Sequence, residues 1–217
     1  MRPRKTYHHG DLKAHLADAA LAFLEHHHPE ALSIRDLCRE LGVSPMAPYR
    51  HFEDKAALLI HLAKSGCGEL LRQLKAAEEN EADPRRLLAN CAEVYARFAR
   101  EKSSQFRLIF GAELSRAGDR AAPVIELAMQ CIEVLVRAIS AGQRTKSIRD
   151  DVPAARIAEV VWMAVHGYAE INLNGHGEAT PEALNLLIDT VLRGISAPRR
   201  SRAFARRNDG LPRFGLR

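Results

Sequence analysis

Five side chains between residues 44 and 55 could hold phosphate groups. They bring two hydroxyls, a guanidinium, an imidazole and an ammonium, and three of them are consecutive in the chain. All of these groups are suited to phosphate oxygens. If the segment is exposed, its chemistry favours contact with the phosphate backbone of a nucleic acid. The five residues are Ser44, Tyr49, Arg50, His51 and Lys55.

Two short helices over residues 33–52 would present these side chains. The first is capped by Ser33, has apolar residues at i, i+3, i+4 and i+7 from Ile34 onward, and ends at Gly42, where a left-handed residue is favoured. The second begins at Pro45, because proline suits the first helical position. The tight corner between them predicts a helix-turn-helix, whose second helix protrudes and can enter a DNA major groove ~12 Å wide.

Position within this motif suggests further roles. Met46 and Ala47, in the first turn of the second helix, would face base edges, and Ser44 would cap that helix. Ser33 and Arg35, at the start of the first helix, would reach the flanking phosphates. Pro48 lacks the N–H that would close the first backbone bond and disfavours helical angles at the residue before it. We therefore expect the second helix to open irregularly, or to be regular only from Pro48.

The segment SIRDLCRELGVSPMAPYRHFEDKAALL, residues 33–59, resembles the DNA-binding end of the TetR/AcrR family of bacterial transcriptional regulators. The resemblance covers roughly residues 8–72 and implies a helix-turn-helix DNA-binding domain there. It implies that Ser44, Tyr49, His51 and Lys55 contact phosphates and that Met46 and Ala47 lie near bases. A shorter segment, VVWMAVHGYAEI, resembles the WHG-type C-terminal ligand-binding domain through Trp162, His166 and Gly167.

The rest of the chain also has the pattern of helices. Apolar residues recur at helical spacing between prolines and glycines, and no alternating run of β-branched residues indicates a strand. We predict an all-α fold of about nine helices, with a ligand-binding and dimerisation body over residues 83–197. Residues 198–217 are rich in Arg, Ser, Gly and Pro with little to bury, which predicts a basic disordered tail.

Six aromatic residues between positions 95 and 168, together with a histidine, could surround an apolar ligand. Ordinary core packing is the alternative for each of them. The residues that we expect to line a pocket are Tyr95, Phe98, Phe106, Phe110, Trp162 and His166.

The last two helices each have a wide apolar stripe, and Ala164 and Gly167 would allow a close approach. Two adjacent stripes suggest a four-helix interface between two copies of the chain. The alternative is that both helices pack on the preceding one. In a dimer, the two helix-turn-helix motifs could contact the two half-sites of a palindrome, which lie about one DNA turn (~34–36 Å) apart.

Composition limits the other possibilities. The net charge is +5, but seven arginines and one acid after residue 197 contribute +6, so the remaining residues sum to −1. No stretch approaches the ~18 apolar residues of a membrane span, and the first residues lack the apolar segment of a secretory signal. The four cysteines form no C-x-x-C pair, so we expect reduced core thiols in a cytoplasmic protein.

The function that these observations favour is a ligand-responsive repressor that binds a palindromic operator as a homodimer. It is expected to need no metal or other cofactor. A helical metal-dependent enzyme is one alternative, but a di-iron site needs two E-x-x-H pairs and only Glu25 and His28 form one. The other alternative is a sequence-independent architectural DNA binder that uses the arginine tail.

Overall fold

The computed structural model describes residues 12–177 and 180–197 of the 217-residue chain. Within these residues the chain forms nine α-helices and no β-strand, which confirms the predicted all-α class. No helix among the described residues is both long and apolar enough to cross a membrane. The predicted tail, residues 198–217, lies outside the described residues.

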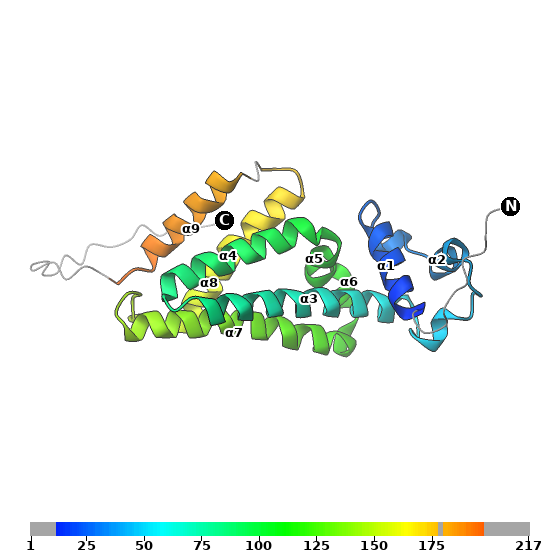
Figure 1. Cartoon of the computed structure of the whole chain (residues 1–217), viewed down its shortest axis with the longest axis horizontal. Helices are drawn as coiled ribbons and strands as arrows, with labels where there is room; N and C mark the ends of the chain where they lie inside the picture. The colour runs from blue at the N-terminus through cyan, green and yellow to red at the C-terminus, as the bar shows by residue number, and fades with distance from the viewer. Residues whose placement is uncertain (1–11, 178–179, 198–217) are drawn as a thin grey trace, which may run out of the picture.

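A small head lies at one end of an elongated molecule (Figure 1). It contains α1 (Leu12–Leu24), α2 (Ile34–Leu41) and the start of α3 (Lys55–Asn80). The Ser33 side chain accepts a hydrogen bond from the backbone N–H of Asp36, so it caps α2 as predicted. Gly42 ends α2 with a φ of 66°, a left-handed conformation that glycine adopts without strain.

The body is a bundle packed around the long α3, which extends from the head and lies beside α7 (Figure 1). Helices α4 and α7 each begin with a proline in the first turn, and α4 is capped by Asp83, whose carboxylate accepts from two backbone N–H groups. The body helices are α4 (Pro84–Glu101), α5 (Ser103–Phe110), α6 (Ala112–Arg116), α7 (Ala122–Arg144), α8 (Ala154–Leu173) and α9 (Pro181–Gly194).

Close packing fixes α3 to α5 in the middle of the body. A Cβ atom added at Gly66 would lie 2.7 Å from Cβ of Gln105, closer than two such atoms can approach. The buried Gln105 donates from Nε2 to the backbone carbonyl of Leu62 at 3.2 Å. The helix that enters the head is therefore held directly against a helix of the body.

The number of helices agrees with the prediction, but their identity differs in two places. Residues 45–52 were expected to form a helix and instead form a turn followed by a 3₁₀ helix, Pro48–Arg50. The five-residue α6 was not predicted, because a helix this short cannot show an apolar periodicity.

Candidate functional site

The segment after α2 is exposed at the end of the head. Met46 and Tyr49 are 70% and 50% exposed, and Arg50 and His51 are also exposed. Pro48 and Phe52 point the other way and are buried, which anchors the segment to the head. Of the predicted phosphate-contacting side chains, Ser44, Tyr49, Arg50 and His51 are therefore accessible to solvent, and Lys55 is partly so.

The backbone of this segment is irregular where the sequence predicted irregularity. The Ser44 hydroxyl accepts from the N–H of Met46 at 3.4 Å, and the Ser44 carbonyl accepts from Ala47 at 2.9 Å, so Ser44 closes a turn rather than capping an α-helix. The regular part begins at Pro48 and is 3₁₀, because the N–H groups of Arg50 and His51 donate to the carbonyls three residues earlier, of Ala47 and Pro48. The exposed Pro45 lies in the turn.

The other predicted contact residues flank this surface. Arg35 is exposed in the first turn of α2, and Ser33 is partly exposed as its cap. The Lys55 ammonium donates to the backbone carbonyl of Glu30 at 2.8 Å. An ammonium has three donors, so Lys55 could keep this bond and still reach a phosphate.

Ion pairs join the head to the body beside α3. Arg120, just before α7, donates to both carboxylate oxygens of Asp54 at 2.9 and 2.8 Å. These bonds, with the backbone N–H of Ala57, lower the pKa of Asp54 to about 2. Arg116 of α6 lies 3.4 Å from the carboxylate of Glu30. No sequence pattern indicated these pairs, because their partners are far apart in the chain.

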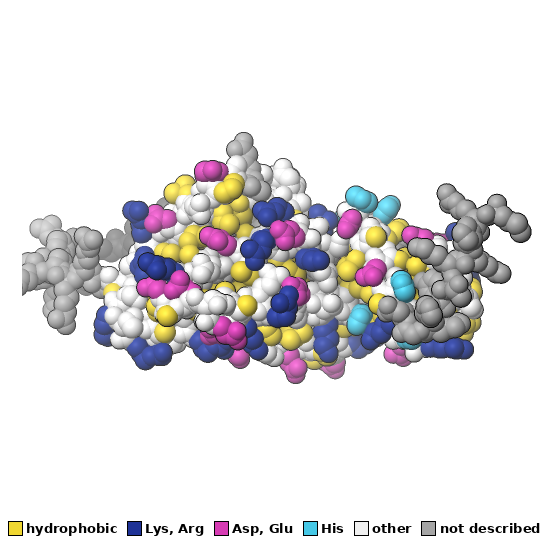
Figure 2. Space-filling model, viewed as in Figure 1, with side chains coloured by type: hydrophobic (Ala, Val, Ile, Leu, Met, Phe, Trp, Pro, Cys, Tyr) yellow, Lys and Arg dark blue, Asp and Glu magenta, His cyan; other side chains and the backbone are white. Residues whose placement is uncertain are grey.

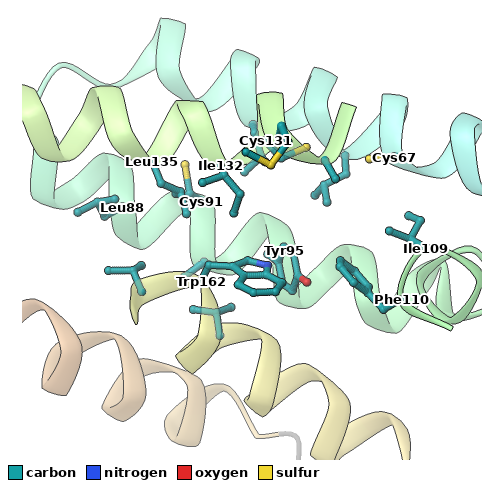
Figure 3. A pocket seen from close by; sticks show the side chains of 17 residues that line it. Cys67, Leu88, Cys91, Tyr95, Ile109, Phe110, Cys131, Ile132, Leu135 and Trp162 are labelled. Carbon is teal, nitrogen blue, oxygen red and sulfur yellow. The ribbon is translucent and has the colours of Figure 1, made fainter. Parts of the chain in front are cut away.

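A cavity of about 290 Å³, partly open to solvent beside the exposed Met129, lies in the body between α3, α4, α5, α7 and α8. Tyr95, Trp162 and Phe110 lie on one side of it, and Cys131 and Ile132 lie on the other (Figure 3). None of the side chains that line it is a Lys, Arg, His, Asp or Glu. The cavity is suited to an apolar molecule.

A buried tyrosine and a partly buried histidine form a polar pair behind the aromatic side of this cavity. The Tyr95 hydroxyl and Nδ1 of His166 are 2.8 Å apart, and Nε2 of His166 is 3.9 Å from a carboxylate oxygen of Glu170. The imidazole is enclosed by rings, with centroid distances of 4.5 Å to Phe110 and 5.0 Å to Trp162. Burial lowers the pKa of His166, and Glu170 opposes that shift. Burial also raises the pKa of Tyr95.

Three of the six residues predicted to line a pocket do so: Tyr95, Phe110 and Trp162. The other three, Phe98, Phe106 and His166, do not line this cavity. Phe98 and Phe106 are almost wholly buried in the core, where ordinary packing accounts for them. The His166 ring stacks against the rings of Phe106 and Trp162.

Most of the lining was not predicted. It consists of aliphatic residues on the stripes that were assigned to the core, and of three thiols contributed by α3, α4 and α7. A stripe that faces a cavity has the same sequence pattern as one that faces a packed core, so periodicity does not separate them. All four cysteines are free and buried, as expected; those that line the cavity are Cys67, Cys91 and Cys131.

The consecutive histidines at positions 26–28 do not gather around one point. The His27 ring stacks on Phe23 at 4.2 Å and its Nδ1 lies 3.0 Å from the Phe23 carbonyl, while His26 and His28 are exposed. Within the described part of the chain, no three His, Cys, Asp or Glu side chains are grouped as a metal site.

The outer faces of α8 and α9 expose large apolar side chains. Val160, Met163 and Ile171 of α8 are at least half exposed, and Leu186 of α9 is 67% exposed. No residue of α9 is buried within the single chain. On the face shown in Figure 2, apolar side chains are visible between charged ones in the region of α9 and α4.

Comparison with known families supports this division into head and body. Residues 16–62 match the model of bacterial regulatory proteins of the tetR family. Residues 88–195 match the tetracyclin repressor-like C-terminal domain, and this range includes the Trp162-to-Gly167 segment. No curated protein sequence matches the chain.

Solved structures share the whole arrangement. A protein of unknown function from Rhodococcus sp. RHA1 is 34% identical, with a TM-score of 0.77, over 89% of this chain and 100% of that one. The TetR family transcriptional regulator PfmR from Thermus thermophilus is 22% identical, with a TM-score of 0.69, over 82% and 97% of the two chains. AibR, solved with isovaleryl coenzyme A and operator DNA, is 16% identical, with a TM-score of 0.66, over 86% and 99%.

The two family models match separate parts of the chain, the head and the body, and together they include most of the described residues. The exposed turn of the head and the apolar cavity of the body lie within those two matched ranges. The chain belongs to the TetR/AcrR family of transcriptional regulators.

Proposed function

We propose that the protein is a repressor that binds a palindromic operator as a homodimer and is released by a small apolar ligand. The observation that carries this proposal is the connection through α3. One helix begins beside the exposed 44–51 segment and, further along, lines the apolar cavity with Cys67, Leu70 and Leu74.

The head would bind DNA through the exposed segment. Tyr49, Arg50 and His51 would contact phosphates along one strand, with Ser44 and Lys55 beside them. Ser33 and Arg35 would contact the flanking backbone. Met46, which is exposed in the turn, would lie against base edges through apolar contacts, and Ala47, which is partly buried against the head, would lie beside it. The operator DNA in the AibR structure supports this placement of a related fold.

Two copies would associate through the outer faces of α8 and α9. The exposed apolar residues of these helices are what a four-helix interface would bury. A Cβ atom added at Gly167 meets no other atom within 4 Å, so this part of α8 leaves room for a partner helix. The pairing would set the distance between the two heads.

Ligand binding would act on the heads through α3. A ligand that favours one position of α5 and α7 also favours one position of α3, because these helices are closely packed. The shift in DNA affinity is limited by the ligand's differential affinity for the two states, and coupling of ~1–3 kcal/mol is typical.

The direct test is to select duplexes from a random pool with the purified protein and to sequence them. We expect a palindrome with half-sites about one helical turn apart. Tyr49→Ala should weaken binding to every duplex by a similar factor, whereas Met46→Ala should change which sequence is preferred. An unchanged affinity of Tyr49→Ala for all duplexes would show that this segment does not contact DNA.

Salt dependence provides a second measurement on the same duplexes. Arg50→Gln removes one phosphate-neutralising charge, so the slope of log K against log salt should fall by about 0.9. Arg144→Gln is the matched control, because Arg144 is an exposed arginine in the body, at the end of α7. Equal slopes for the two variants would contradict the proposed phosphate contact.

A further inference from the structure

Three thiols line the apolar cavity, and reversible ligand binding gives them no role. Cys67 comes from α3, Cys91 from α4 and Cys131 from α7. We infer that the cavity is a covalent modification site, in which Cys67 is the nucleophile, Cys131 is a positioning residue that activates it, and the reagent is an uncharged apolar Michael acceptor. For its effect on DNA binding this inference rests on the proposed function, whereas the covalent step is measured without DNA.

Hydrogen bonding distinguishes two of these thiols, which lie across the cavity from the rings of Tyr95 and Trp162 (Figure 3). Cys67 and Cys131 are hydrogen-bonded to each other. The Cys67 thiol also donates to the backbone carbonyl of Val124, with 3.9 Å between sulfur and oxygen. A thiol has a single proton to donate, so the proton between the two sulfurs belongs to Cys131. The Cys67 sulfur accepts it and is stabilised when it becomes a thiolate.

This hydrogen bond also separates the acidities of the three thiols. It lowers the pKa of Cys67, although burial acts in the opposite direction, and it raises the pKa of Cys131. Burial raises the pKa of Cys91 to about 12. Since the thiolate is the nucleophilic form of cysteine, Cys67 is the reactive thiol of the cavity.

The lining determines which reagents reach Cys67. Its side chain is 1% exposed, so a reagent must enter through the cavity, which is open beside Met129. The lining contains no amine or imidazole, and burial raises the pKa of the Tyr95 hydroxyl, so thiols are the nucleophiles that a reagent meets. A charged reagent would lose its hydration without a partner in this lining, which is unfavourable. An uncharged apolar electrophile that reacts with thiols is therefore favoured.

The reaction is an addition, so it needs no oxidant and releases no leaving group. The Cys67 sulfur forms a bond to the β-carbon of the acceptor, and the C=C π bond breaks to give an enolate. The α-carbon of the enolate then takes one proton, which replaces the proton that Cys67 lost on ionisation. The product has the mass of the protein plus that of the whole reagent.

An adduct at Cys67 would change α3 itself. This helix packs against α5 and α7 in the body and begins at Lys55, beside the exposed 44–51 segment. A covalent adduct does not dissociate, so its effect on DNA affinity would persist after the free reagent is removed. A ligand that binds reversibly would lose its effect on the same treatment.

Three related probes test the assignment on the purified protein. N-phenylmaleimide is an uncharged Michael acceptor, N-phenylsuccinimide lacks the C=C bond, and the para-carboxyphenyl maleimide has the same reactive group with a negative charge. Intact mass and peptide mapping locate the adducts. We expect N-phenylmaleimide to add first at Cys67, at least roughly 10-fold faster than at Cys38, a buried thiol of the head whose pKa is raised by burial.

The other two probes are controls for the chemistry and for the lining. N-phenylsuccinimide should leave the mass unchanged, because it cannot add. The charged maleimide should react with Cys67 at least roughly 10-fold more slowly than N-phenylmaleimide, each rate being taken relative to free cysteine. Cys67→Ala should remove the fast adduct.

Variants of Cys131 test its role as a positioning residue. Cys131→Ala removes the donor, so the rate at Cys67 near neutral pH should fall roughly 10-fold and the midpoint of its pH–rate profile should rise by about one unit. Cys131→Ser keeps a donor and should restore most of the rate. Cys91→Ala is the matched control, because it also removes a thiol from the lining and should leave the midpoint unchanged. Thermal unfolding shows whether each variant is folded.

Three results would overturn the inference. One is a first adduct at Cys38, Cys91 or Cys131, or no adduct at Cys67 at all. Another is an equal relative rate for the charged maleimide. The third is a pH–rate midpoint that Cys131→Ala leaves unchanged. Selection of duplexes by the unmodified protein is measured separately, so a failure of labelling leaves the proposed function intact, and a protein that selects no duplex can still be labelled at Cys67.

Discussion

His166 is an ionisable side chain held where its charged form is unfavourable. It is enclosed by the rings of Phe106, Phe110 and Trp162, and its neighbours that can titrate are Tyr95 on α4 and Glu170 on its own helix. Burial lowers its pKa below the usual value of 6.5. Between the folded and unfolded pKa values, the unfolded chain therefore binds more protons than the native protein.

Because of this difference in proton binding, His166 should make the protein less stable in acid. As the pH falls through about 6.5 towards the lower native pKa, the free energy of unfolding should decrease, by ~1.4 kcal/mol for each unit of pKa difference. His166→Gln cannot titrate and should lose less stability between about pH 7.5 and pH 5. Urea midpoints at the two pH values measure this. His26→Gln, at an exposed position, should behave as the parent; equal pH dependence of all three proteins would contradict the prediction.

The sequence predicted which residues of the head are exposed, but it did not predict which aromatic residues of the body pack against one another and which face the cavity. Tyr49, His51 and Met46 were expected to be exposed from the motif alone, and they are. The aromatic residues of the body were chosen by type, and only tertiary packing separates Phe110, which lines the cavity, from Phe106, which is fully buried beside it. Both lie on the same short helix, so neither period nor composition could distinguish them.

At the scale of elements, sequence signals that act over a few residues indicate where helices start, and they predicted part of the irregular structure after Ser44. The starts of α4 and α9 are marked in the sequence itself, where a capping residue, Asp83 or Thr180, stands directly before a proline, because these signals act within a few residues. Pro48 correctly predicted an irregular start after Ser44, but not that the whole segment would lack an α-helix. The contact between Arg120 and Asp54 joins residues 66 positions apart, and no local rule reaches that far.

The Arg120–Asp54 pair is expected to matter more for coupling than for stability. Both side chains are nearly half exposed, so Arg120→Ala should cost less than ~1 kcal/mol of unfolding free energy. The pair also holds the start of α3 against the body. Its loss should therefore weaken the effect of the ligand on DNA binding, measured as the DNA affinity without ligand divided by the DNA affinity with ligand. Fluorescence anisotropy on the selected duplex, with and without 1-decanol as an apolar probe, measures that ratio.

Arg156→Ala is the matched control for this variant. Its partner Glu159 is on the same helix, so the pair does not connect the head to the body. The pKa of Asp54, about 2, means that the Arg120 pair persists at the neutral pH of the assay and is lost only as the pH falls below about 3.8 towards 2. If the two variants change the affinity ratio equally, the pair has no role in coupling.

At the scale of the whole molecule, one helix connects two regions with different chemistry. The head exposes hydroxyl and basic groups, and the body contains an apolar cavity. Helix α3 extends through both parts (Figure 1). The sequence predicted this division because the motif and the amphipathic helices are local patterns. The position of the cavity could not be predicted, because it depends on how five helices leave space between them.

Association of two chains gives the last prediction. Leu186→Asp places a carboxylate on the outer face of α9, where the proposed interface would bury it, so the dimer should dissociate at least roughly 100-fold more readily. Sedimentation equilibrium measures this. Operator affinity should fall as well, because a monomer contacts one half-site.

Ile125→Asp is the control, since Ile125 is 52% exposed on α7, outside the proposed interface. A dimer weakened by Ile125→Asp and not by Leu186→Asp would move the interface away from α8 and α9.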